Sequence, residues 1–177
     1  MAVVDTQRRK AAAPALTPEA HARPTLRALA VVDGSAGAGR VIKYLIDLHR
    51  GGAPLDVVLL NIQPRPQEWR LRGYGWFARD AIHDRLINDL GRRIVASAAR
   101  YLDSVGISHR DRIELGDRGE TILRCVREEG CDLLVLADCR HGAIRQWLAR
   151  TGRISIGSVA CFVAAGANVP VVIVPRA

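Results

Sequence analysis

Short apolar runs that alternate with segments of helical periodicity are the feature that most constrains the fold of this chain. Largely apolar runs lie at 29–32, 56–62, 133–137 and 169–174. Between them, apolar residues recur every three or four positions, as on the buried side of a helix. Strands that are apolar throughout are typical of a parallel sheet covered on both faces. With a shorter strand at 112–115, the pattern predicts an α/β fold: a five-stranded parallel sheet, doubly wound with helices on both faces.

The 112–115 strand alternates polar and apolar side chains, which predicts a half-exposed or edge strand. After it, Asp117 and Glu120 have the spacing of a capping box at the start of a helix. A longer helix is predicted between the second and third strands, and Gly106 is its expected end. One face of that helix is marked, at four-residue steps, by Ile82, Leu86, Leu90, Ile94, Ala98 and Leu102.

The first 25 residues differ from the rest of the chain. They carry Arg8-Arg9-Lys10 and an Ala-Pro stretch but no periodic apolar face, so residues 1–25 are expected to form a flexible basic tail. The 177 residues suffice for one core, and residues 26–177 are expected to form one domain. No apolar run approaches the ~20 residues that span a bilayer, so we expect a soluble, cytoplasmic protein without a membrane partner.

The basic charge does not by itself indicate a nucleic-acid partner. The net charge is +8, and 24 of the 26 basic residues are arginines scattered along the chain, which we interpret as solvated faces and coding bias. The cysteines form no CxxC pair and are expected to be small buried side chains without a disulfide. Cys139 and His141 lack further ligands at zinc-site spacing, so no metal site is predicted. The four cysteines are Cys125, Cys131, Cys139 and Cys161.

Ligands of doubly wound sheets collect beyond the carboxyl ends of the strands, where the strand order reverses. Three segments should meet there: Asp33-Gly34-Ser35, Asn61 to Pro64, and Ala137 to Ser158. Asp33 could accept hydrogen bonds from a sugar or a base, and Ser158 could hold a phosphate at the start of a helix. Taken alone, Asp33-Gly34-Ser35 is better explained as a turn plus a helix cap. Gly34, Gly37 and Gly39 have the order GxxGxG, which does not favour a dinucleotide site.

Four segments together resemble the universal stress protein family. They are Val31 to Ser35, Gly116 to Leu123, Gly130 to Leu136, and Gly157 to Ala160 with the final strand from Val169 to Val174. The resemblance implies a five-stranded fold like that of the adenine nucleotide alpha hydrolases and a homodimer formed through the C-terminal strand 169–174. It also implies ATP as a ligand in members with the pattern G-x2-G-x9-G-[S/T]. From the meeting of the three segments and from this resemblance together, the candidate site residues are Asp33, Gly34, Ser35, Asn61, Ala137, Arg140, Gly142, Gly157, Ser158 and Val159.

The chain departs from that glycine pattern. Ala137 and Arg140 stand where the first two glycines belong, whereas an alignment on Gly142 puts Cys139 at the first. The loop is also five to seven residues longer than the pattern. One interpretation is that its arginines replace glycine backbone as the anion holder. The other is a solvated loop over a closed, vestigial site, which we favour.

The main hypothesis is therefore a dimeric stress-response or regulatory module with a degenerate nucleotide site between the first strand, the fourth strand and the helix at 157–166. No cofactor is certain, and ATP or another adenine nucleotide is the candidate ligand. One alternative is an ATP-binding member with an arginine-rich phosphate loop and slow ATP hydrolysis. Another is a partner-docking protein that uses the aromatic and arginine-rich loop 63–80. No GxSxG elbow is present, and we do not predict an enzyme.

Overall fold

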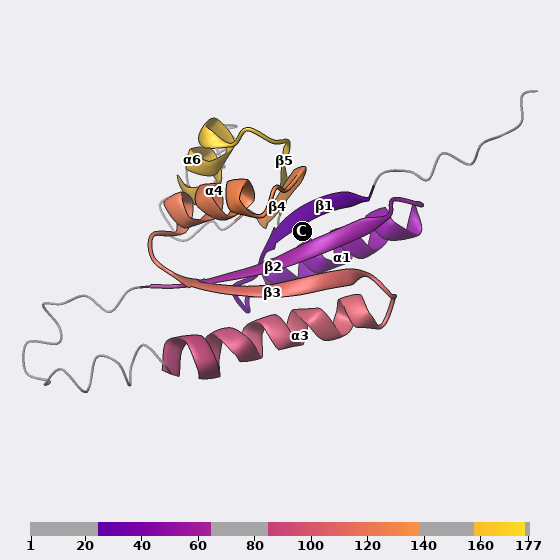
Figure 1. Cartoon of the computed structure of the whole chain (residues 1–177), viewed down its shortest axis with the longest axis horizontal. Helices are drawn as coiled ribbons and strands as arrows, with labels where there is room; N and C mark the ends of the chain where they lie inside the picture. The colour runs from indigo at the N-terminus through magenta and orange to yellow at the C-terminus, as the bar shows by residue number, and fades with distance from the viewer. Residues whose placement is uncertain (1–24, 65–84, 139–157, 176–177) are drawn as a thin grey trace, which may run out of the picture.

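The computed structural model describes residues 25–64, 85–138 and 158–175, which form one twisted sheet with helices on both faces (Figure 1). The α/β prediction is confirmed. In chain order the elements are β1 (Leu26–Val31), α1 (Ala36–Arg50), β2 (Leu55–Gln63), the π-helical segment η2 (Arg85–Gly91), α3 (Arg92–Asp103), β3 (Ser108–Leu115), α4 (Arg118–Glu128), β4 (Leu133–Ala137), α6 (Ser158–Gly166) and β5 (Val171–Val174).

The five described strands pair in parallel in the order β3-β2-β1-β4-β5. From β1 the chain moves outward through β2 to β3, and it then returns to the other side of β1 to form β4. The strand order therefore reverses between β1 and β4. In doubly wound sheets, ligands bind beyond the carboxyl ends of the strands at such a reversal.

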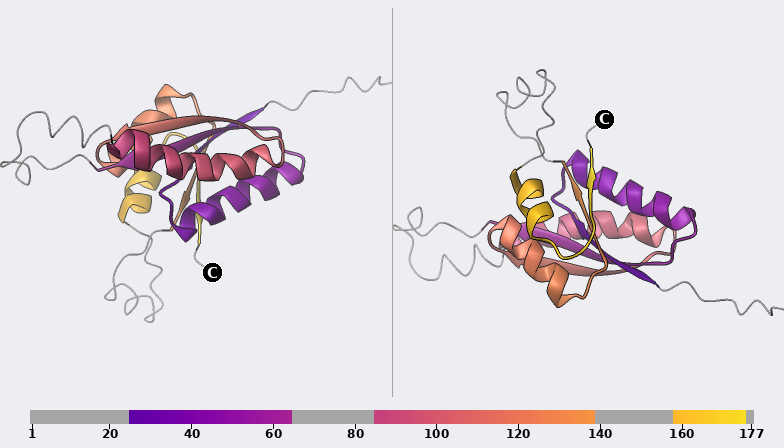
Figure 2. Two further views of the ribbon diagram at one scale, coloured as in Figure 1. Left: turned by 90° about the horizontal axis from the view of Figure 1, so that it is seen from below. Right: turned by 90° about the horizontal axis from the view of Figure 1, so that it is seen from above.

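Each face of the sheet has its own core. Helices α1 and α3 cover one face, and α4 and α6 cover the other (Figure 2). Successive residues of β1 belong alternately to the two cores. Ala28 and Ala30 face α1 and α3, whereas Leu29 faces α4 and α6. This double burial explains why the central strands are largely apolar.

The start of α4 and the position of β3 agree with the sequence. The Asp117 carboxylate caps α4 by accepting a hydrogen bond from the Glu120 backbone N–H, with Oδ1 to N at 3.1 Å. Strand β3 is an edge strand, as its alternation predicts. It is longer than expected because residues from Ser108 onward already pair with β2, in register from Asp56↔Ser108 to Gln63↔Leu115.

The prediction for the long helix is wrong at its N-terminal end. Within the described residues, the helix starts with η2 and becomes α-helical at Arg92, while Ile82 lies outside them. A π-helical turn contains more residues than an α-helical turn, so positions four apart do not stay on one face across the junction. Leu90, placed by its spacing on the buried face, is 48% exposed, whereas Val95 and Leu102 are fully buried.

The cysteine prediction is confirmed for two residues and wrong for one. Cys125 and Cys131 are buried, and burial raises the pKa of each thiol to about 11. Cys161 is exposed on α6, because this helix is apolar on all sides and only one of them faces the sheet. Cys139 lies outside the described residues. No helix in the described ranges has both the length and the apolar character needed to cross a bilayer.

Candidate functional site

The segment after β1 forms a tight turn that starts α1. The Asp33 carboxylate accepts a hydrogen bond from the Ser35 backbone N–H, with Oδ1 to N at 3.0 Å. Gly34 has φ of 77°, a left-handed conformation that glycine adopts without strain. Ser35 is the N-cap of α1, and its Oγ accepts a hydrogen bond from Gly37 N at 3.1 Å. The interpretation of Asp33-Gly34-Ser35 as a turn plus a helix cap is thus confirmed.

The end of β4 lies directly against the first turn of α1. A Cβ atom placed on Gly37 would lie 2.8 Å from the Cβ of Ala137, closer than such atoms approach in proteins. Ala137 is buried, and the register between β4 and β5 pairs it with Val174. Ala137, one of the two candidates for the first glycine position of the pattern G-x2-G-x9-G-[S/T], therefore fills the space between β4 and α1.

Asn61 lies inside β2 and is only 1% exposed. Its Nδ2 donates a hydrogen bond to the carbonyl oxygen of Val32 at 2.7 Å, and its Oδ1 accepts one from Gln63 Nε2 at 2.6 Å. Val32 immediately precedes the turn at Asp33. The amide of Asn61 is therefore used to fix the end of β1.

Arg40 brings a positive charge to the same edge of the sheet. Its Nε donates a hydrogen bond to the carbonyl oxygen of Pro175 at 2.9 Å, just beyond β5. One of its terminal nitrogens lies 3.5 Å from the Cβ position at Gly37. The sequence alone does not single out Arg40. Its position on α1 becomes informative only when the fold shows that β5 ends beside this helix.

The remaining predicted site residues belong to the segment that leads into α6. Helix α6 begins at Ser158, and Val159 is half-buried against the core formed with α4. Arg140, Gly142 and Gly157 lie outside the described residues, as does the side chain of Ser158. Within the described ranges, no group of three or more His, Cys, Asp or Glu side chains lies close enough to hold a metal ion.

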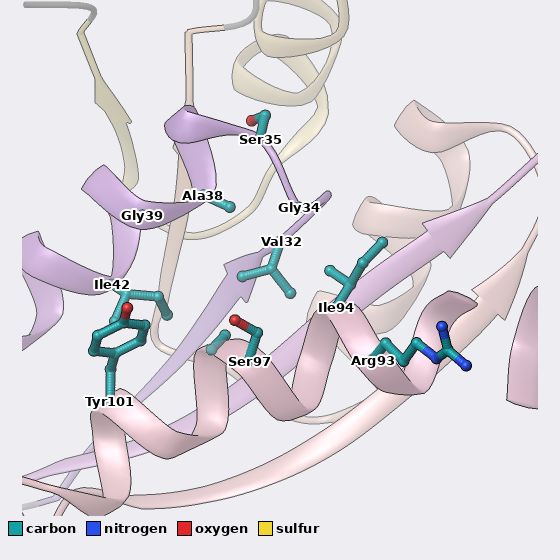
Figure 3. Close-up of a pocket in the computed structure, with 11 residues that line it drawn as sticks. Val32, Gly34, Ser35, Ala38, Gly39, Ile42, Arg93, Ile94, Ser97 and Tyr101 are labelled. Atoms are coloured by element: carbon teal, nitrogen blue, oxygen red, sulfur yellow. The ribbon is translucent and has the colours of Figure 1, made fainter. Parts of the chain in front are cut away.

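A cavity of about 340 Å³ opens between α1 and α3, at the carboxyl end of β1 (Figure 3). Its wall contains Gly34 and Ser35 of the predicted site, but most of its other residues were not predicted. Sequence patterns could not indicate the residues of α3, because only the packing of α3 beside α1 brings them to this place. The cavity is lined by Val32, Gly34, Ser35, Ala38, Gly39, Ile42, Arg93, Ile94, Ser97, Ala98 and Tyr101.

Comparison with known proteins relates the chain to one family. The model of the universal stress protein family matches residues 25–175, which is most of the chain. No curated protein sequence matches it. Among solved structures, the hypothetical protein MJ0577 is similar with a TM-score of 0.69 and 22% identity, over 86% of this chain and 96% of that chain.

Two further similar structures contain adenine nucleotides. A universal stress protein family protein from Arabidopsis thaliana, with AMP bound, has a TM-score of 0.60 and 15% identity, over 86% of this chain and 92% of that chain. A universal stress protein in complex with cAMP has a TM-score of 0.56 and 17% identity, over 84% of this chain and 95% of that chain. At these identities the likeness shows a shared fold.

Proposed function

The chain belongs to the universal stress protein family, and from this premise we propose that it is a dimeric regulatory module of the stress response that senses an adenine nucleotide at an altered site. The nucleotide would bind at the carboxyl ends of β1 and β4, next to the start of α6. The observation that carries this proposal is the reversal of strand order between β1 and β4, beside the turn at Asp33.

Two contacts, one at Ala137 and one at Asp33, support a nucleotide site that differs from the family pattern. Ala137 fills the space beside α1, so glycine backbone does not face a phosphate there. Asp33 uses Oδ1 within its own turn, and its second carboxylate oxygen can accept a hydrogen bond from a ribose hydroxyl or an adenine amino group. These contacts favour recognition of the nucleoside half of the ligand over recognition of a triphosphate.

Isothermal titration with AMP, cAMP and ATP tests this function. We expect AMP and ATP to bind with affinities within about threefold of each other, because the added phosphates gain no strong contact. Asp33→Asn retains the turn but removes one acceptor, and it should weaken binding about fivefold. Asp47→Asn, on the exposed side of α1, is the matched control. Absence of binding by all three nucleotides would exclude nucleotide sensing.

Arg40 favours a second candidate function, ATP binding with arginine side chains in place of the glycine loop. Its Nε is engaged by Pro175, whereas its terminal nitrogens have no hydrogen-bond partner among the described residues. This function predicts that ATP binds more than tenfold tighter than AMP, because a guanidinium contacts the added phosphates. Arg40→Gln should abolish the difference, and Arg100→Gln, on the exposed side of α3, should leave it unchanged.

Homodimerisation belongs to the same proposal. The apolar strand β5 is the edge of the described sheet opposite β3, and its four residues are only partly buried. An unprotected apolar edge strand favours pairing with a second copy of itself. A dimer would place the two nucleotide sites of the module in one assembly.

A further inference from the structure

We propose that the cavity between α1 and α3 is a second ligand site, which binds a small amphiphilic monoanion. The ligand would place an apolar body in the cavity and a single carboxylate at the end next to the start of α1. A medium-chain carboxylate has this chemistry. The proposal goes beyond nucleotide sensing. The cavity shares Gly34 and Ser35 with the predicted nucleotide site, but neither Ala137 nor α6 contributes to its wall.

The size and walls of the cavity suit the body of such a ligand. Its volume of about 340 Å³ falls within the range of small-molecule pockets. Most of the wall is apolar, with Val32 at its centre and Ala38, Ile42 and Ile94 around it (Figure 3). Ala98 also lines the cavity. No carboxylate from the described residues lines it.

The polar groups of the wall are donors. The Ser35 Oγ accepts a hydrogen bond from Gly37 N, so its proton remains able to donate. The hydroxyl of Ser97 has no partner among the described residues and can also donate. Helix α1 has no acidic residue in its first turn. The Asp33 carboxylate lies just before it and accepts a hydrogen bond from the Ser35 backbone N–H, so the described cavity wall itself contributes donors and no carboxylate. Donors without an opposing carboxylate favour an anionic group.

The two ends of the cavity differ in character (Figure 3). Gly34, Ile94 and Arg93 lie at one end, where the exposed Arg93 side chain supplies the positive charge of the wall. Ile42 and Tyr101 lie at the other end, and Tyr101 is 62% exposed although it is a wall residue. A bound apolar body would cover this aromatic ring.

The length of the cavity also selects among anions. Arg93 and Tyr101 are separated by eight positions along α3, or about 12 Å of helix. An extended medium-chain carboxylate can therefore reach from the donor end to Tyr101. Acetate has no apolar body to fill this space, and an inorganic phosphate gains nothing from the apolar walls.

Displacement of the fluorescent anion anilinonaphthalene sulfonate from the full chain tests the proposal. We expect decanoate to displace the dye and uncharged decanol to do so at least about tenfold more weakly. Ser97→Phe should fill the cavity and weaken decanoate binding more than about tenfold. Ala96→Phe adds the same ring at a neighbouring exposed position outside the cavity and should leave binding unchanged.

The carboxylate is tested by a second pair of variants. Arg93→Gln should weaken decanoate binding about fivefold, whereas Arg92→Gln, exposed on the same helix but outside the cavity, should have no effect. Circular dichroism of each variant checks that the fold is retained. Equal binding of decanoate and decanol, equal effects of Ser97→Phe and Ala96→Phe, or displacement of decanoate by saturating AMP would each overturn the proposal. Failure of AMP to bind anywhere would overturn nucleotide sensing and leave this site unaffected.

Discussion

Asn61 is the residue that joins the two central strands to the turn at Asp33. It is buried, and it satisfies the carbonyl of Val32 and the amide of Gln63 at the same time. A buried polar group that loses its partner bears its full desolvation cost. One side chain therefore contributes both to the stability of the sheet and to the shape of the candidate site.

We expect Asn61→Ala to lower the free energy of unfolding by about 2 to 3 kcal/mol, because it leaves the Val32 carbonyl and the Gln63 amide without their partner. It should also weaken any nucleotide bound at Asp33, since the end of β1 is no longer fixed. Urea unfolding followed by circular dichroism measures the first effect, and titration with AMP measures the second.

Ser104→Ala is a suitable control for Asn61→Ala. The Ser104 hydroxyl donates to the Tyr101 carbonyl at an exposed position, so water can replace it, and the loss should stay below about 1 kcal/mol. Equal losses for the two variants would contradict the structural role assigned to Asn61.

Among the elements, α1 carries the closest contact with the sheet. Its second residue, Gly37, has room for no side chain, because a Cβ there would lie 2.8 Å from the Cβ of Ala137. Neither Cβ can rotate away, since each is fixed to its backbone. Gly39, one half-turn later, has no neighbour within 4 Å of the same position. Substitutions at the two glycines therefore measure different effects: close packing at Gly37 and helix propensity alone at Gly39.

Gly37→Ala should lower the free energy of unfolding by about 1 to 2 kcal/mol, because overpacking outweighs the gain in helix propensity. Gly39→Ala should raise it by about 0.5 to 1 kcal/mol, since only the propensity gain remains. Chemical denaturation of the two variants measures both changes. Adding Ala137→Gly should relieve the cost of Gly37→Ala in a double-mutant cycle, and additive effects would contradict a direct contact.

The sequence predicts elements well where periodicity and caps agree, as for β4 and the start of α4. It fails at η2, because a spacing of four residues marks one face of an α-helix and not of the π-helical segment that contains the exposed Leu90. The turn at Asp33 was predicted, since a short polar segment determines its own hydrogen bonds. The positions of Arg40 and Ser97 were not, because they depend on which helices and strands become neighbours.

For the whole molecule, the two edges of the sheet have opposite character. On β3, Arg110 pairs with Asp56 and Glu129, at 3.2 and 3.3 Å, and Arg112 and Arg124 continue this ion-pair network to Glu114. Burial acts to raise the pKa of Glu114, but hydrogen bonds from Arg124 and Arg112 outweigh it and hold that pKa below its usual value. The β3 edge therefore stays charged at neutral pH, which disfavours pairing with another strand.

The β5 edge, in contrast, carries only Val171 to Val174. The carbonyls of Pro170 and Val174 accept hydrogen bonds from Leu134 and Asp138, so they face β4. Because successive residues of a strand alternate between its two sides, Val171 and Ile173 direct their backbone N–H and C=O groups away from β4. These outward groups are the ones that a second copy would bind, and a change at Ile173 can remove one of them without breaking the sheet.

We expect Ile173→Pro to convert the proposed dimer into a folded monomer, because proline removes an outward N–H while the bonds to β4 remain. Ile173→Ala is the matched control: it shortens the same side chain but keeps the N–H, so the dimer should persist. Sedimentation equilibrium measures the mass of each variant, and circular dichroism checks the fold. If wild type is a monomer at micromolar concentration, or if Ile173→Pro remains as dimeric as Ile173→Ala, pairing through β5 is excluded. Because a β5 interface lies on the far side of α1 from the cavity wall of α3, the monomer should still bind decanoate.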